Sequence, residues 1–78
     1  MVKFINNWMF ASRLWNDAKP TPVAINLHNI AKIEQVQIPS LGENIVAAYL
    51  KNEDKLIPIE GDIIEILAEF QKHLINQL

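Results

Sequence analysis

The sequence predicts an α+β fold in which a small antiparallel meander of three to four strands packs against one C-terminal helix. Two apolar runs, residues 44–50 and 56–59, are separated by the polar turn 51–55, a pattern typical of a β-hairpin. After Gly61, apolar side chains recur at the spacing of an amphipathic helix. This order of strand, turn, strand and helix indicates a sheet with one face covered by a helix.

The length of the chain, 78 residues, leaves room for a single domain, 1–78. Within it we distinguish an aromatic N-terminal strand and loop, 1–22, from a strand–strand–strand–helix unit, 23–78. A domain of this size buries only about 60% of the surface of its unfolded chain. The chain has no cysteine, which removes disulfides and thiolate zinc sites as reinforcement. Association is the remaining means of stabilisation, so we expect a homodimer.

The N-terminal segment fits two periodicities. With a period of two, the residues that share one face of a strand are Val2, Phe4, Trp8 and Phe10. A helical period instead aligns Phe4 and Trp8 with Trp15. Aromatic residues favour strands, and no N-cap residue precedes the segment, so we predict a strand over 2–10. The turn residues and two prolines within 11–22 predict a loop.

The next segment, 23–38, alternates between apolar and polar positions. The residues that point to one face are Val23, Ile25 and Leu27. A polar stretch, 26–29, predicts a turn or short break. Further along, the apolar positions change phase, which predicts a β-bulge near Glu34 and Gln35. The following connection contains Gly42, where we expect a positive φ.

The strand 44–50 is apolar on both faces, which is typical of a central strand that is covered on both sides. The helix covers one face, and either the N-terminal aromatic residues or a second copy of the chain would cover the other. Because Pro58 cannot donate a ladder hydrogen bond, we expect the strand around it to lie at an edge or to end there. The apolar stripe of the helix consists of Ile63, Ile66, Leu67, Phe70, Leu74 and Leu78.

Charge and hydropathy exclude several classes of function. Seven basic and nine acidic residues give a net charge of −2, and the basic residues are scattered singly, whereas nucleic-acid binders usually have a basic cluster. No apolar run reaches the roughly 18 residues of a membrane span, and no signal-peptide cleavage site follows the N-terminus. We therefore expect a cytoplasmic protein that has no membrane span and does not bind nucleic acid.

Residues that could carry chemistry are few. Glu65, Glu69 and His73 lie in one line along the predicted helix and could hold a divalent metal, but such a line is more typical of a solvated face with weak ion pairs. Neither serine lies in a nucleophile motif, and the two glycines are isolated, so no phosphate-binding loop is present. We predict no catalytic, metal-binding or cofactor-binding residues, and no enzyme activity.

Aromatic residues are the best candidates for a functional surface. Two tryptophans within the first 15 residues are a large apolar surface for so small a chain. They could cover the sheet face that the helix leaves open, line a protein interface, or form a membrane-surface helix, although such helices carry more basic residues. The candidate interface residues are Phe4, Trp8, Phe10, Trp15 and Tyr49.

Residues 23–78 resemble the small flagellar and swarming-motility proteins of the FlbD type. In that family an N-x-x-x-I-x-x-I-E stretch leads into a strand, followed by a polar turn, a second strand and a closing helix. The matching residues here are Asn26, Ile30, Ile33, Glu34, Ile57, Ile59, Glu60 and 63–67. The chain departs from the family in its insert 11–22 and in the Asn-Glu-Asp of its polar turn. The resemblance implies a small regulatory protein related to motility.

The same stretch is also similar to LytTR-type DNA-binding domains, which carry an I-x-x-I-x-Y-I-E element before a strand hairpin and a helix. The aromatic and basic loop residues that contact DNA in that family have no counterparts here. Instead, Lys51 and Lys55 flank two acidic residues, which argues against the same activity.

The function that these observations favour is that of a non-catalytic adaptor or regulatory module. It would act through self-association and contacts with a protein partner that the sequence does not identify. The alternative is a LytTR-like DNA-binding domain. A third class, a sheet-pocket binder of a small ligand, lacks an evident polar anchor in the sequence.

Overall fold

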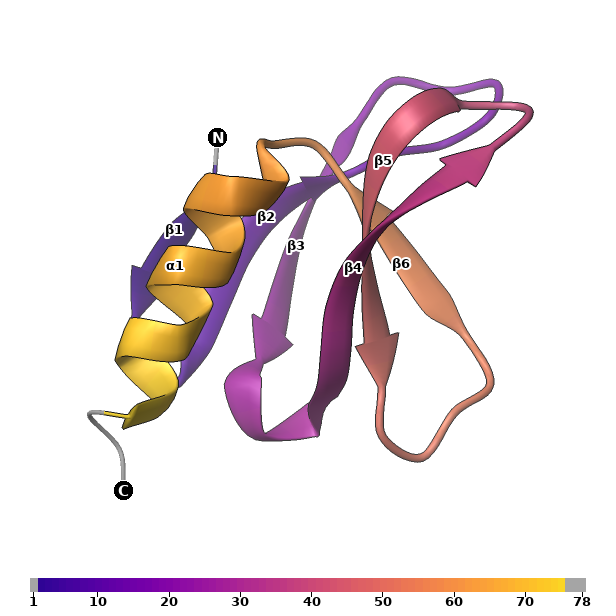
Figure 1. Cartoon of the computed structure of the whole chain (residues 1–78). Coiled ribbons are helices and arrows are strands. Elements are labelled where there is room, and N and C mark those ends of the chain that lie inside the picture. The colour runs from indigo at the N-terminus through magenta and orange to yellow at the C-terminus, as the bar shows by residue number, and fades with distance from the viewer. Residues whose placement is uncertain (1, 76–78) are drawn as a thin grey trace.

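The computed structural model describes residues 2–75 and has an α+β fold (Figure 1). Its antiparallel sheet has six strands, so the predicted number of three to four was too low. The strands are β1 (Lys3–Ile5), β2 (Trp8–Arg13), β3 (Thr21–Asn26), β4 (Ile30–Ile38), β5 (Gly42–Leu50) and β6 (Leu56–Ile59). A 3₁₀ turn, η1 (Leu27–Asn29), links β3 to β4, and one helix, α1 (Ile63–Ile75), follows β6.

The additional strands come from the N-terminal region. The predicted single strand over 2–10 is a hairpin, because the chain reverses at Asn6 and Asn7 between β1 and β2. Asn6 has a φ of 54°, a left-handed conformation that asparagine tolerates and that tight hairpins use. The second strand continues to Arg13, so the loop is shorter than predicted and spans 14–20.

The sheet order is β1-β2-β6-β5-β4, with β3 paired to the other edge of β2. Two strands, β2 and β6, meet at a single register pair, Arg13 with Ile59. Next to it, the Leu14 N–H donates to the Pro58 carbonyl over 2.9 Å. The missing N–H of Pro58 faces the same side, so β2 cannot extend its ladder there. The strand that contains Pro58, β6, ends one residue after it, as predicted. However, β6 lies inside the sheet and not at its edge.

The middle of the chain follows the predicted alternation. Ile25 and Leu27 are buried and Val23 is half-buried, and the predicted break at 26–29 is η1, which Asn26 caps by accepting a hydrogen bond from the His28 N–H. The bulge was predicted in the wrong place. The register between β4 and β5 is regular at Glu34 and shifts at two other points, between residues 30 and 32 and between residues 36 and 38.

The central strand β5 is buried on both faces only at its middle residues, 46–48. Val46 and Ala48 belong to the hydrophobic core, and Ala47, which points the other way, is 0% exposed. Glu34 and Pro58 lie directly opposite Ala47 on the two flanking strands, so larger neighbours enclose its small side chain. A second copy of the chain is therefore not needed to bury this position.

The curled sheet encloses the core, and α1 lies across its open side (Figure 1). The helix contacts β1 and β4. Its Ile66 is buried in the core, and the half-buried Ile63 and Phe70 pack against the core. Asp62 caps the helix by accepting a hydrogen bond from the Glu65 N–H over 3.1 Å. The buried stripe of the helix is narrower than predicted, because Leu67 is 39% exposed. The last predicted member of the stripe, Leu78, lies outside the described residues.

Candidate interaction surface

Large apolar side chains gather on the outward face of the N-terminal hairpin. Ile5, Trp8 and Phe10 are 54%, 43% and 43% exposed. They are neighbours in the sheet, because Ile5 pairs with Trp8 across the β1–β2 ladder and Phe10 follows Trp8 on the same face of β2. A rigid pair of strands therefore presents three large apolar side chains together.

Alternation along β2 explains why these residues point outward. Met9 is 0% exposed and Ala11 is buried, and both belong to the core. Since successive side chains of a strand point to opposite faces, burial of Met9 and Ala11 directs Trp8 and Phe10 away from the core. The strand is apolar on both faces, but the chain itself covers only one of them.

The outward face carries almost no charge. By register and alternation it comprises Lys3, Ile5, Trp8, Phe10, Ser12, Pro22, Ala24 and Asn26, which we call the hairpin face. Among these eight residues Lys3 is the only charged one, and none is acidic. An apolar centre with a sparse polar rim is the composition of a protein interface.

Phe4, the first of the predicted interface residues, lies on the opposite face of the hairpin. It is half-buried and packs against the core, and its ring stacks on the His73 ring of α1 with centroids 5.2 Å apart. The structure thus separates Phe4 from Trp8 and Phe10. The prediction that they share a face was wrong because the turn at Asn6 and Asn7 shifts the phase of the alternation.

Trp15 lies in the loop after β2, where two contacts hold it. Its Nε1–H donates to Thr21 Oγ1 over 2.8 Å, and the guanidinium of Arg13 lies 4.2 Å from the centroid of its ring. It is not a member of the hairpin face, so the structure does not bring the two tryptophans together.

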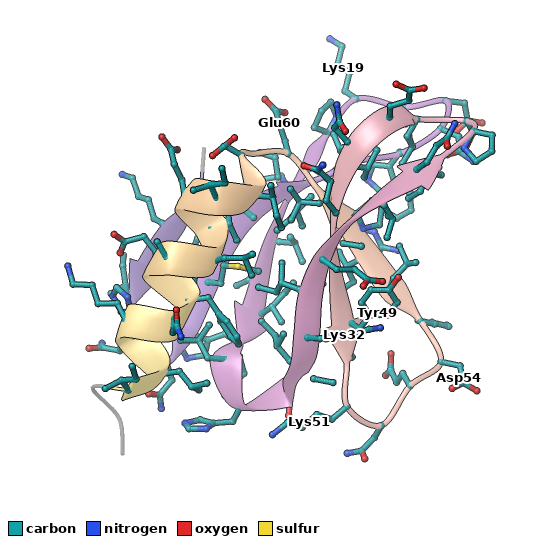
Figure 2. The ribbon with its side chains drawn as sticks, viewed as in Figure 1. Lys19, Lys32, Tyr49, Lys51, Asp54 and Glu60 are labelled. Carbon is teal, nitrogen blue, oxygen red and sulfur yellow. The ribbon has the colours of Figure 1, made fainter. Side chains whose placement is uncertain are left out.

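Tyr49, the last predicted interface residue, lies on β5 within a polar group (Figure 2). Lys32 Nζ is 4.6 Å from the centroid of the tyrosine ring and 3.6 Å from Glu34 Oε1. A hydrogen bond to Glu34, together with desolvation and the charge of that carboxylate, raises the pKa of Tyr49 above its ordinary value of 10.0. These contacts satisfy the side chain within the sheet.

Of the three aligned residues Glu65, Glu69 and His73 on α1, His73 packs against other side chains. His73 Nδ1 lies 2.9 Å from the Glu69 carbonyl oxygen and 3.6 Å from Glu69 Oε2, and its ring stacks on Phe4. Within residues 2–75 no three histidine, aspartate or glutamate side chains are arranged to hold a metal ion. In the same part of the chain, no helix has both the length and the apolar character needed to span a membrane.

Comparison with known proteins gives no relative: no family model, curated protein or solved structure matches the chain. The resemblances to FlbD-type and LytTR-type proteins therefore stay predictions.

Sequence reasoning identified two of the three apolar residues at the centre of the hairpin face and missed Ile5. A signal for it was available, because two consecutive asparagines between apolar residues are compatible with a two-residue hairpin turn. A hairpin closed there pairs Ile5 with Trp8 and places both on one face.

Proposed function

We propose that this chain is a non-catalytic interaction module that acts through its hairpin face, and that a second copy of the chain binds there. The observation that carries the proposal is the exposure of Ile5, Trp8 and Phe10 side by side on paired strands. Tryptophan and other large side chains at the centre of an interface contribute most of the binding free energy.

The size and core of the chain support self-association. None of its aromatic side chains, three phenylalanines, two tryptophans and one tyrosine, is fully buried. Among residues 2–75, the largest side chains that are fully enclosed are Met9, Leu27, Ile59 and Val46. A small core that leaves its aromatic residues outside gains by association.

Charge supports a second copy as the occupant. In a two-fold symmetric dimer the same patch meets itself, so a patch with several like charges would repel its copy. Lys3 is the only charged member of the hairpin face, and it lies on the edge strand β1. A standard interface takes about 800 Å² from each partner, which is about 15% of the 5380 Å² of accessible surface of the chain.

An adaptor or regulatory role, which the FlbD-type resemblance implies, requires a further protein partner. A homodimer would present two copies of the loop 14–20 and of α1 to such a partner. The LytTR-like alternative is weaker, since the basic residues are distributed over different elements.

The test is the effect of Trp8→Thr on the oligomeric state. Threonine retains strand propensity but removes most of the apolar surface, and a symmetric interface contains the residue twice. We expect the wild-type chain to be dimeric and the variant to dimerise at least tenfold more weakly, which is about 1.4 kcal/mol. Light scattering and sedimentation over a dilution series measure the dissociation constant.

The control is Ile64→Ala on α1. Ile64 is 75% exposed, so this change also removes exposed apolar surface, but from another element and with no loss of helix propensity. We expect its dissociation constant to equal that of the wild type. A wild-type chain that stays monomeric at high micromolar concentration contradicts the proposal, and so does a Trp8→Thr variant that dimerises normally.

A further inference from the structure

A second feature lies away from the hairpin face, at the other end of β2. There the loop 14–20, the β4–β5 turn and β6 border a cavity of about 320 Å³ that is largely open to solvent. Its volume lies within the size range of small-molecule sites, about 300–1,000 Å³. Two hydrogen bonds hold its walls. Ser40 Oγ donates to Asn16 Oδ1 over 2.8 Å, and the Leu14 N–H donates to the Pro58 carbonyl over 2.9 Å. The loop and the turn lie side by side in Figure 1.

The cavity combines apolar residues with the cation of Arg13 and with three further polar residues, Asn16, Asp17 and Ser40. Leu14, Leu41 and Leu56 contribute to the apolar part, and Arg13 contributes the guanidinium. Binding pockets are typically apolar with a few placed polar groups that fix the orientation of the ligand. Arg13 is the polar anchor that sequence reasoning did not find for a ligand-binding function.

Arg13 is held in position but is not neutralised. Its guanidinium lies 4.2 Å from the centroid of the Trp15 ring, and the indole N–H of Trp15 is fixed by Thr21 Oγ1. Among residues 2–75, Arg13 has no ion pair, and its Nε is shielded from solvent with no hydrogen-bond acceptor. Because the ring covers the face of the guanidinium, the donors that remain available lie along its edge.

We propose that this cavity binds a carboxylate attached to an apolar group, with Arg13 as the anchor. The edge of a guanidinium presents paired N–H donors that match the two oxygens of a carboxylate. Because Nε is shielded from solvent, the terminal N–H groups of the guanidinium are the donors that an incoming carboxylate would meet. Leu14, Leu41 and Leu56 would receive the apolar part of the ligand.

Asp17 sets a limit on this binding. It also lines the cavity but forms no ion pair with Arg13, and its negative charge repels an incoming carboxylate when ionised. Removal of that charge should therefore strengthen binding. This makes Asp17 a variant whose expected effect is opposite in sign to that of Arg13.

Titration of the full chain with hexanoate, followed by NMR, tests the proposal. The Nε–H of Arg13 and the indole N–H of Trp15 give side-chain signals that report directly on the cavity. We expect both to shift in a saturable manner with hexanoate, and hexanamide, which has the same shape without the charge, to bind at least tenfold more weakly, about 1.4 kcal/mol. Equal binding of the two probes, or no shift with hexanoate, overturns the proposal.

Variants assign the anchor. Arg13→Gln should lose hexanoate binding, and Arg13→Lys should retain only part of it, because an ammonium cannot make the paired contact. Asp17→Asn should bind more tightly than the wild type. The control Asp54→Asn, in the β5–β6 turn and outside the lining of the cavity (Figure 2), should not change binding. A backbone spectrum that stays native in each variant shows that the fold is retained. Unchanged binding by a folded Arg13→Gln variant overturns the proposal.

One further arm identifies the source of the carboxylate. The dipeptide Leu-Leu is compared with its C-terminal amide, which differs only in the terminal charge. Tighter binding of the free acid than of hexanoate assigns the site to a peptide C-terminus, and the reverse order assigns it to a small organic acid. Both results support a carboxylate site, whereas equal binding of the dipeptide and its amide counts against one.

Discussion

At the scale of single residues, the two glycines are required for different structural reasons. Both have positive φ values that side chains rarely adopt, +121° at Gly42 and +153° at Gly61. A Cβ at Gly42 would meet no atom within 4 Å, whereas a Cβ at Gly61 would lie 2.6 Å from Ile66 Cδ1. The first glycine therefore serves only the backbone, and the second also makes room for the helix.

We predict that Gly61→Ala destabilises the chain more than Gly42→Ala. Each change forces a side chain into a strained backbone conformation, at about 1–3 kcal/mol. Gly61→Ala must also displace the buried Ile66, which adds about 1 kcal/mol for an off-rotamer side chain. Denaturant midpoints of both variants measure the difference. Equal losses would mean that Ile66 can move aside without cost.

The turn at Asn6 and Asn7 limits how much of the hairpin face can be predicted from the sequence. Residue type makes Trp8 and Phe10 candidates for an interface, but the same criterion wrongly groups Phe4 with them. The phase of the alternation depends on whether Asn6 and Asn7 continue a strand or reverse it. Asparagine is compatible with both, so periodicity alone could not separate Phe4 from the two outward residues.

At the scale of elements, α1 closes the sheet along a narrow line. Ile66 is 3% exposed, whereas its neighbour Leu67 is 39% exposed. The helix contacts the sheet through β1 and β4, so the side chains nearest that line are buried and those one position away meet solvent.

Adjacent truncations on α1 should therefore differ strongly. Ile66→Ala removes a buried side chain and should cost about 2–5 kcal/mol, whereas Leu67→Ala should cost less than about 1 kcal/mol, because much of the side chain is already exposed. Alanine has high helix propensity in both cases, so the helix itself is not the variable. Thermal and denaturant unfolding of the two variants check this, and similar costs would mean that α1 is rotated relative to the sheet.

The elements that sequence reasoning predicted well are those with long, unambiguous patterns. The two-sided strand β5, the following turn and α1 depend on runs of apolar residues whose length leaves little choice. The short strands β1 and β2 depend on the two-residue turn between them, and the bulges of β4 depend on its register with β5. Gln35 opposes the buried Val46, for example, so the ladder stays regular where the apolar phase changes.

At the scale of the whole molecule, the distribution of charge bears on the DNA-binding alternative. Figure 2 shows Lys19, Lys32 and Lys51 at the top, the middle and the bottom of the view. Lys32 is also paired with Glu34, and Arg13 lines a cavity. A DNA-binding face needs several cations that contact phosphates at once, and these positions do not form such a face.

We therefore predict that random duplex DNA binds no more tightly than about 10⁻⁴ M at an ionic strength of about 0.15 M, the weak end of non-specific binding. The salt dependence should also be shallow, since few counterions are released when few phosphates are contacted. Fluorescence polarisation with a labelled duplex measures both, with Lys51→Gln as a variant that should not change the result. Submicromolar binding with a steep salt dependence that Lys51→Gln reduces would favour the LytTR-like alternative, and would place the functional surface at the β5–β6 turn instead of the hairpin face.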